Sequence, residues 1–102
     1  MNVDRTAACL EALGNPTRLA IFQLLVRAGR DGIPVGSVQG HLGIPASTLS
    51  HHIARLTRVG LVTQERRSRS LVCRADYGVM TGVIDFLTTN CCEGVEANED
   101  AV

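Results

Sequence analysis

The sequence lacks any apolar run of about eighteen residues, the length that a transmembrane helix needs, so no membrane span is expected. Its first residues, Met1–Arg5, are polar and do not have the pattern of a secretory signal peptide, so we expect a cytoplasmic protein with no membrane partner. Also missing are a Cys-x-x-Cys pair, a glycine loop that could hold phosphates and a suitable cysteine–histidine pair. A small thiol oxidoreductase is one function that a chain with several cysteines could have. These absences argue against it.

Basic residues are missing from the last quarter of the chain. Residues 76–102 contain six carboxylates and no basic residue, a net charge of −6, whereas residues 16–75 contain nine arginines against two carboxylates, a net charge of +7. A chain of 102 residues is enough for one small domain, whose limited core would gain from a second subunit. We therefore expect a basic DNA-binding and dimerisation domain at 1–92 and an acidic, disordered tail at 93–102.

One amphipathic helix is predicted between Pro45 and Gly60, and the rest of the chain is organised around it. Proline is suited to the first turn because its ring presets a helical φ, and glycine commonly ends a helix in the left-handed conformation. At a hundred degrees per residue, Leu49, Ile53 and Leu56 form one apolar stripe. The opposite side carries hydroxyl and cationic groups and no carboxylate: Ser47, His51, Arg55 and Arg58, with Thr48 at its edge.

The preceding segment predicts a helix-turn-helix. A short helix ending at Leu42 and a turn at Gly43 lead directly into the amphipathic helix. In such an arrangement the second helix enters the major groove, where arginine reads guanine and serine or threonine contacts bases or phosphates. A merely solvated helix face is the alternative.

Two short strands are predicted at 61–65 and 70–75, joined by a tip at 66–69. Three arginines at a loop tip repel one another, but beside a phosphate backbone each can release a counterion, so we interpret the hairpin as a DNA-binding wing and keep a plain exposed turn as the alternative. The residues expected to meet DNA are Ser47, Thr48, Ser50, His51, His52, Arg55, Arg66, Arg67 and Arg69.

Three further helices are predicted, at 3–13, at 16–27 and from Tyr77 to about Cys92. The first has an apolar side with Cys9 beside it, and the second has almost no polar face and is expected to be the central buried helix. The apolar stripe of the last helix is too wide for the edge of a small monomer, so we expect it to pair with its counterpart in a dimer. The first stripe consists of Val3, Ala7, Leu10 and Leu13, and the last of Val79, Met80, Val83, Phe86 and Leu87.

The runs Leu13–Leu19 and Ser47–Leu56, followed by Val59–Val62, resemble the arsenic-responsive repressor (ArsR) family of winged-helix transcriptional regulators. The resemblance implies a mainly α fold with a small β-hairpin, a winged helix-turn-helix that dimerises through its first and last helices. It also implies a homodimeric repressor that binds palindromic double-stranded operator DNA and is released by an inducer. The cysteine-rich metal site that one branch carries on the third helix is missing from Val35–His41, and no histidine lies in the last helix to form the zinc site of another branch.

Four cysteines, Cys9, Cys73, Cys91 and Cys92, are expected to be reduced thiols in the cytoplasm. The α-carbons of the adjacent pair are about 3.8 Å apart, below the usual disulfide range. The run Asn90–Gly94 resembles the cysteine pair near the last helix of an arsenite-sensing branch, although the further downstream cysteine of that branch is missing here.

Soft thiolates select soft ions, and trivalent arsenic prefers three sulfur ligands. Cys91 and Cys92 are expected to supply two of them and Cys9, from the same or the other subunit, the third; Cys73 is expected to be a small buried hydrophobe. No cofactor is required in this prediction, and the inducer is As(III) or Sb(III). Hg(II) and oxidants are alternatives, the latter in a redox or persulfide-sensing repressor of the same fold.

Overall fold

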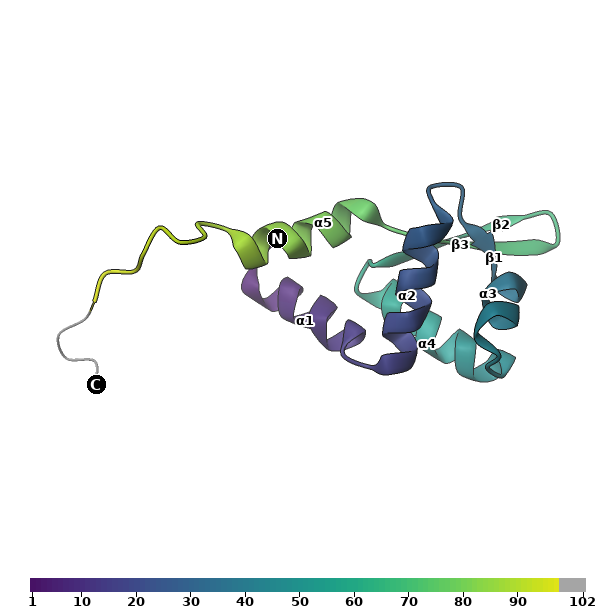
Figure 1. Ribbon diagram of the computed structural model, residues 1–102. Helices are drawn as coiled ribbons and strands as arrows, with labels where there is room; N and C mark the ends of the chain where they lie inside the picture. The colour runs from purple at the N-terminus through teal and green to yellow at the C-terminus, as the bar shows by residue number, and fades with distance from the viewer. Residues whose placement is uncertain (98–102) are drawn as a thin grey trace.

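Five helices and three short strands follow one another in the computed structural model, in which residues 1–97 are described (Figure 1). They are α1 (Val3–Leu13), α2 (Pro16–Ala28), β1 (Ile33–Pro34), α3 (Val35–Leu42), α4 (Ala46–Arg58), β2 (Val62–Arg67), β3 (Ser70–Ala75) and α5 (Tyr77–Thr88). Helices α1 and α5 lie together at one end, and the sheet with α3 lies at the other. This order confirms the predicted winged helix-turn-helix. Within the described residues, no helix is both long enough and apolar enough to cross a membrane.

Side-chain caps explain where three of the helices begin. Asn2, Asn15 and Asp76 each precede a helix, and each side chain accepts a hydrogen bond from the backbone N–H three residues later. Such caps satisfy backbone donors that have no partner within the helix. Pro16 follows Asn15 at the first position of α2, as predicted.

The sheet contains one strand more than the sequence predicts. Its order is β1-β3-β2, all antiparallel, and Ile33 of β1 pairs with Cys73 of β3. Only the two strands of the hairpin were predicted, so the pairing of β1 with β3 is a finding of the structure. The close approach depends on Gly32, which has a φ of +73° and would place a Cβ 2.6 Å from the carbonyl oxygen of Cys73. No other residue type fits there without a shift of the backbone.

The wing hairpin is tighter than predicted. Residues 66–69 were expected to form its tip, but Arg66 pairs with Leu71 and Arg67 pairs with Ser70 across the two strands. That prediction is wrong for the first two residues. Continued strand pairing leaves Ser68 and Arg69 to turn the chain, and Ser68 has a φ of +57°. Left-handed residues are typical of such short hairpin turns.

The core lies between α2, α4 and the sheet. Its largest fully buried side chains come from all three, and Leu56 and Leu25 are both completely inaccessible. Helix α2 is central, as predicted. It is not buried on all sides, however, because the side chain of Leu19 is 52% exposed. The hydroxyl of Tyr77 donates a hydrogen bond of 2.9 Å to the carbonyl of Val26 and so joins α5 to α2.

Helix α1 packs against the rest of the chain through a face of small side chains. The buried residues are Thr6, Cys9 and Ala12, whereas Val3 is 67% and Leu10 is 41% exposed. Two members of the predicted apolar stripe, Val3 and Leu10, therefore do not face this chain's core. Small side chains allow α1 to approach its neighbours closely, and the larger ones are left on the outer surface.

Helix α5 ends at Thr88, four residues before the predicted end. The hydroxyl groups of Thr88 and Thr89 bond to carbonyls of the preceding turn, and Asn90 has a left-handed φ of +56°. Hydroxyl groups that bond locally to the backbone compete with helix continuation. Cys91 and Cys92 therefore lie in a turn beyond the helix rather than on it. Part of the predicted tail, residues 98–102, lies outside the described residues.

Candidate functional site

Helix α4 presents the predicted face. Leu49, Ile53 and Leu56 are each at most 1% exposed and anchor one side of the helix in the core. Pro45 is the N-cap, one position before the first turn where it was predicted, and Gly60 is left-handed as predicted, with a φ of +84°. Burial of one stripe determines which residues point outward. On the outer side Ser47, Thr48, Ser50, His51 and Arg58 are all exposed.

Arg55 has a carboxylate partner that the sequence did not reveal. Its Nη2 atom donates to both carboxylate oxygens of Glu11 in α1, at 2.8 and 3.0 Å. Helix α4 itself has no carboxylate, as the sequence shows, but α1 brings the carboxylate of Glu11 to Arg55. The two residues are 44 positions apart, so no local pattern could have indicated the contact.

His52 turns away from the outer face toward a buried cation. Its Nδ1 lies 3.5 Å from Nη1 of Arg18, whose Nε donates a 2.6 Å hydrogen bond to the carbonyl of Ala12. Arginine is always a donor, so a hydrogen bond between the two uses Nδ1 of His52 as the acceptor. Burial, followed by the charge of Arg18, keeps the pKa of His52 below its ordinary value. Smaller contributions from His51 and Arg55 act in the same direction.

Arg18 is a structural residue that the sequence analysis did not single out. It is 9% exposed, and the carbonyl that it binds belongs to the last turn of α1. The partial negative charge at the end of a helix stabilises a cation there. The sequence feature that could have indicated this role is an arginine in the first turn of a mostly apolar helix. Arg18 thus joins α1, α2 and α4 at one point.

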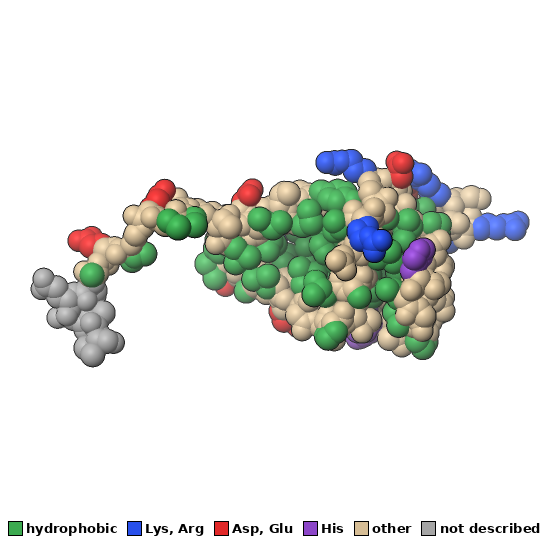
Figure 2. All heavy atoms as spheres, in the orientation of Figure 1, with side chains coloured by type: hydrophobic (Ala, Val, Ile, Leu, Met, Phe, Trp, Pro, Cys, Tyr) green, Lys and Arg blue, Asp and Glu red, His purple; other side chains and the backbone are tan. Residues whose placement is uncertain are grey.

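The wing carries arginines in two different states. Arg67 pairs with Glu65, and Glu65 also bonds Arg74 at 3.2 Å. These hydrogen bonds, first from Arg67 and then from Arg74, hold the pKa of Glu65 below its ordinary value. Arg66 and Arg69 are exposed and take no part in an ion pair with any residue of 1–97. In Figure 2 the arginine side chains are visible over the half of the molecule that contains the sheet, whereas hydrophobic side chains cover much of the end formed by α1 and α5.

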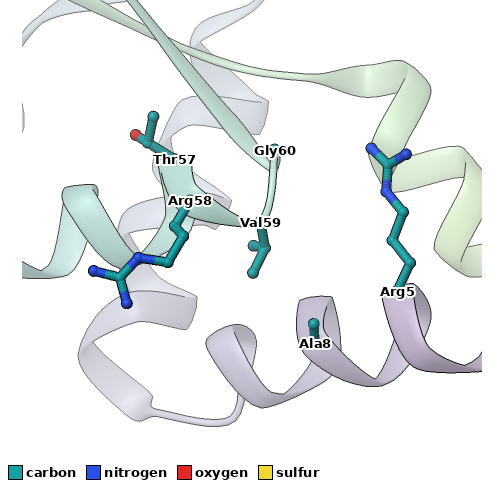
Figure 3. Close-up of a pocket in the computed structure, with 6 residues that line it drawn as sticks. All are labelled: Arg5, Ala8, Thr57, Arg58, Val59 and Gly60. Atoms are coloured by element: carbon teal, nitrogen blue, oxygen red, sulfur yellow. The ribbon is translucent and has the colours of Figure 1, made fainter.

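A shallow cleft of about 340 Å³ separates α1 from the end of α4 (Figure 3). Arg5 and Ala8 form one wall, and Arg58, Val59 and Gly60 form part of the other. Figure 3 shows Arg5 rising from α1 while the guanidinium group of Arg58 points away from it. The two cations therefore do not converge on a common position within the cleft.

The four thiols fall into an exposed pair and two buried residues. The Sγ atoms of Cys91 and Cys92 lie 3.1 Å apart in the exposed turn after α5, and their hydrogen bond raises the pKa of Cys91. Cys9 is fully buried and contacts the carbonyl of Val59 at 3.7 Å. Burial raises the pKa of Cys9, and the charge of Arg5 lowers it by less. Cys73 is fully buried, as predicted for a small hydrophobe.

The structure does not bring the three proposed metalloid ligands together in one chain. Among residues 1–97, no group of three or more histidine, cysteine, aspartate or glutamate side chains is arranged to hold a metal ion. Cys91 and Cys92 are together, and Cys9 lies apart from them in the core beneath the end of α4. A three-sulfur site therefore needs either a rearrangement within the chain or a second subunit.

Known proteins resemble this chain in sequence and in fold. Residues 13–65 match the family described as Helix-turn-helix domain. The chain is 28% identical to the HTH-type transcriptional regulator YgaV of Escherichia coli (strain K12), with 89% of this chain and 90% of that protein covered. It is 36% identical to the HTH-type transcriptional regulator NmtR of Mycobacterium tuberculosis over 67% of this chain and 54% of that protein.

A solved structure shows the same fold. The ArsR-like transcriptional regulator from Rhodococcus sp. RHA1 has a TM-score of 0.76 to this chain at 23% identity, with 88% of this chain and 82% of that chain covered. The family match spans more than half of the present chain, and the sequence relatives are regulators of transcription. The chain therefore belongs to the helix-turn-helix domain family and has a winged-helix fold, and the relatives that it matches in sequence are regulators of transcription, not enzymes.

Proposed function

We propose that the chain is a homodimeric repressor that binds a palindromic operator through α4 and the wing, and that trivalent arsenic or antimony releases it. The observation that carries the DNA-binding part is the outer side of α4, where hydroxyl groups, His51 and Arg58 are exposed while the opposite stripe is anchored in the core. A helix with these groups can enter the major groove, where such side chains contact bases and phosphates.

The DNA-binding residues divide into two groups in this proposal. Ser47, Thr48, Ser50 and His51 are exposed along α4 and face the bases, together with Arg55 once it has left Glu11. The wing arginines Arg66, Arg67 and Arg69 contact phosphates and release counterions. His52 acts at the edge of this surface, because its ring is held toward Arg18.

The dimer is proposed to form through α1 and α5. Val3 and Leu10 of α1 and Ile84 and Leu87 of α5 are large apolar side chains that one chain leaves exposed. The two helices lie together at the end of the molecule opposite the sheet (Figure 1). A second copy that covers this end would give a two-fold arrangement, and a palindromic operator follows from that symmetry.

The inducer site is proposed to begin at Cys91 and Cys92. Two soft sulfur atoms 3.1 Å apart in an exposed turn can bind one thiophilic ion without unfolding the core. Each As–S bond that forms replaces an As–O bond of arsenite, and the thiol proton leaves with that oxygen as water. Cys9 is the proposed third sulfur, from the same or the other subunit.

Recruitment of Cys9 would link the inducer to DNA binding. Its thiol contacts the carbonyl of Val59, which is the C-cap of α4. Moving Cys9 onto the ion breaks that contact and displaces α1 relative to α4. A coupling of about 1–3 kcal/mol would lower operator affinity roughly 5–150-fold, and operator DNA must weaken arsenite binding by the same factor.

The test combines a DNA duplex selected from a random pool with titration of arsenite under reducing conditions. We expect arsenite to dissociate the wild-type complex, and Cys91→Ser or Cys92→Ser to bind DNA normally but resist arsenite. Cys9→Ser should lose the three-sulfur absorption if Cys9 is a ligand. Release by peroxide or persulfide, with no response to arsenite, would instead favour the redox-sensing alternative.

A further inference from the structure

Helix α1 contacts an arginine on the outer side of α4 through an ion pair. The Nη2 atom of Arg55 donates to both carboxylate oxygens of Glu11. Arg55 makes no other side-chain hydrogen bond within the described residues. The carboxylate belongs to the last turn of α1, which is outside the helix-turn-helix.

We infer that Glu11 is a specificity-determining residue that holds Arg55 back in the free protein and releases it to the operator. The inference rests on the proposed DNA-binding function and adds a residue to it. A carboxylate and a DNA phosphate or guanine edge compete for the same guanidinium group. Arg55 therefore binds DNA strongly only where the duplex offers a better acceptor than Glu11.

The ion pair between Arg55 and Glu11 can open with a small loss of free energy. The side chain of Arg55 is 30% exposed and that of Glu11 is 64% exposed, so water and salt reach both. Exposed ion pairs contribute little to stability, and salt weakens them further. A phosphate backbone approaching α4 also repels the carboxylate. Both effects favour transfer of Arg55 from Glu11 to DNA.

The position of Glu11 is set by buried contacts beside it. The neighbouring residue Ala12 is 1% exposed, and its carbonyl accepts the hydrogen bond from the buried Arg18. This hydrogen bond holds the end of α1 against α2. The backbone of Glu11 therefore cannot move with Arg55 when Arg55 leaves the ion pair. The ion pair thus opens when Arg55 moves, while the helix that carries Glu11 stays fixed.

The experiment measures binding of the full chain to a duplex selected from a random pool by the wild-type protein. Glu11→Gln should raise affinity about 1.5- to 5-fold at low salt, because binding no longer has to break the pair. The ratio of the two affinities should approach one as salt increases, since screening weakens the pair in the wild type. Glu11→Ala repeats the measurement without a hydrogen-bonding group at the position.

Two controls separate the ion pair from a general effect of charge. Asp4→Asn removes one carboxylate from the same helix, with the same change in net charge, and should change affinity less than Glu11→Gln. In an Arg55→Ala background, Glu11→Gln should have no effect beyond that of Asp4→Asn. Equal effects of the two carboxylate changes, a gain that persists without Arg55, or a loss of affinity in Glu11→Gln would each overturn the inference.

Failure of the wider proposal has a different signature. If selection enriches no duplex and the wild type binds only in a sequence-independent way, the operator-binding function fails and the role of Glu11 fails with it. If the wild type binds the selected duplex specifically while Glu11→Gln matches Asp4→Asn, only the role of Glu11 is removed.

Discussion

The two ends of the molecule bury their apolar side chains to very different extents. In the half that holds α4 and the sheet, Leu56 is fully buried and the helix stripe around it is complete within one chain. At the other end, Leu87 of α5 is 60% exposed, although both leucines belong to apolar stripes of similar spacing. Hydrophobic periodicity therefore indicates that a face will be covered, but not which chain will cover it.

The same contrast applies to the chemistry of the two ends. In the half that holds α4 and the sheet, Arg18, Arg55 and Arg67 are held by specific partners within the chain. The thiols of Cys91 and Cys92 are exposed beyond the last helix and have each other as partners. One end is preorganised by a single chain, and the other retains groups that a second subunit or an ion can engage.

The strongest test of this comparison is a pair of leucine truncations. Leu56→Ala should lower the free energy of unfolding by about 2–5 kcal/mol, because it leaves a cavity in the core. Leu87→Ala should cost much less in the monomer, since that side chain is mostly exposed. Urea unfolding at low protein concentration measures both. Equal losses would show that the α5 end is already packed within one chain.

A charge at the α5 end should disrupt the proposed dimer. Leu87→Asp is expected to weaken dimer formation on the order of tenfold or more, because a buried contact would become an unpaired charge. Thr81→Asp, at another exposed position of α5, is the matched control. Sedimentation over a range of concentrations compares them. A dimer that tolerates Leu87→Asp would place the interface elsewhere.

Removal of wing charge should change the salt dependence of operator binding. Arg66→Ala and Arg69→Ala should each reduce the slope of log affinity against log salt by about 0.9, the value for one lost phosphate contact. Arg27→Ala removes an exposed arginine from α2 and should leave the slope unchanged. Binding titrations at several salt concentrations provide the slopes. Unchanged slopes in both wing variants would indicate that the hairpin does not reach the DNA.

The smallest expected effect is a pH dependence from His52. Its pKa is lowered in the folded chain by burial and then by Arg18, His51 and Arg55, so the folded state binds fewer protons than the unfolded state below about pH 6.5. This contribution to stability is fully present above that pH and is lost as pH falls through the lowered pKa. Urea unfolding of wild type and His52→Gln should show a shallower pH dependence in the variant. Identical curves would assign the dependence to other groups.

Local signals predicted most of the helices and the hairpin. Asn15 followed by Pro16 marks the start of α2, and Gly60 marks the end of α4, because caps and left-handed residues act over one turn of chain. The end of α5 was missed because hydroxyl–carbonyl bonds at Thr88 and Thr89 compete with the helix. A hydrophobic period alone contains no information about that competition.

The sequence by itself determined the amphipathic α4, with its buried stripe and its hydroxyl and cationic side, since these depend on residue type and a repeat of 3.6 residues. Tertiary structure decided which residues meet across long separations. Glu11 reaches Arg55 over 44 positions, and Cys9 reaches Val59 over 50. It also decided that the small side chains of α1, rather than Val3 and Leu10, would face the core. Such contacts depend on how closely packed helices can approach one another, which the order of residues within one helix does not specify.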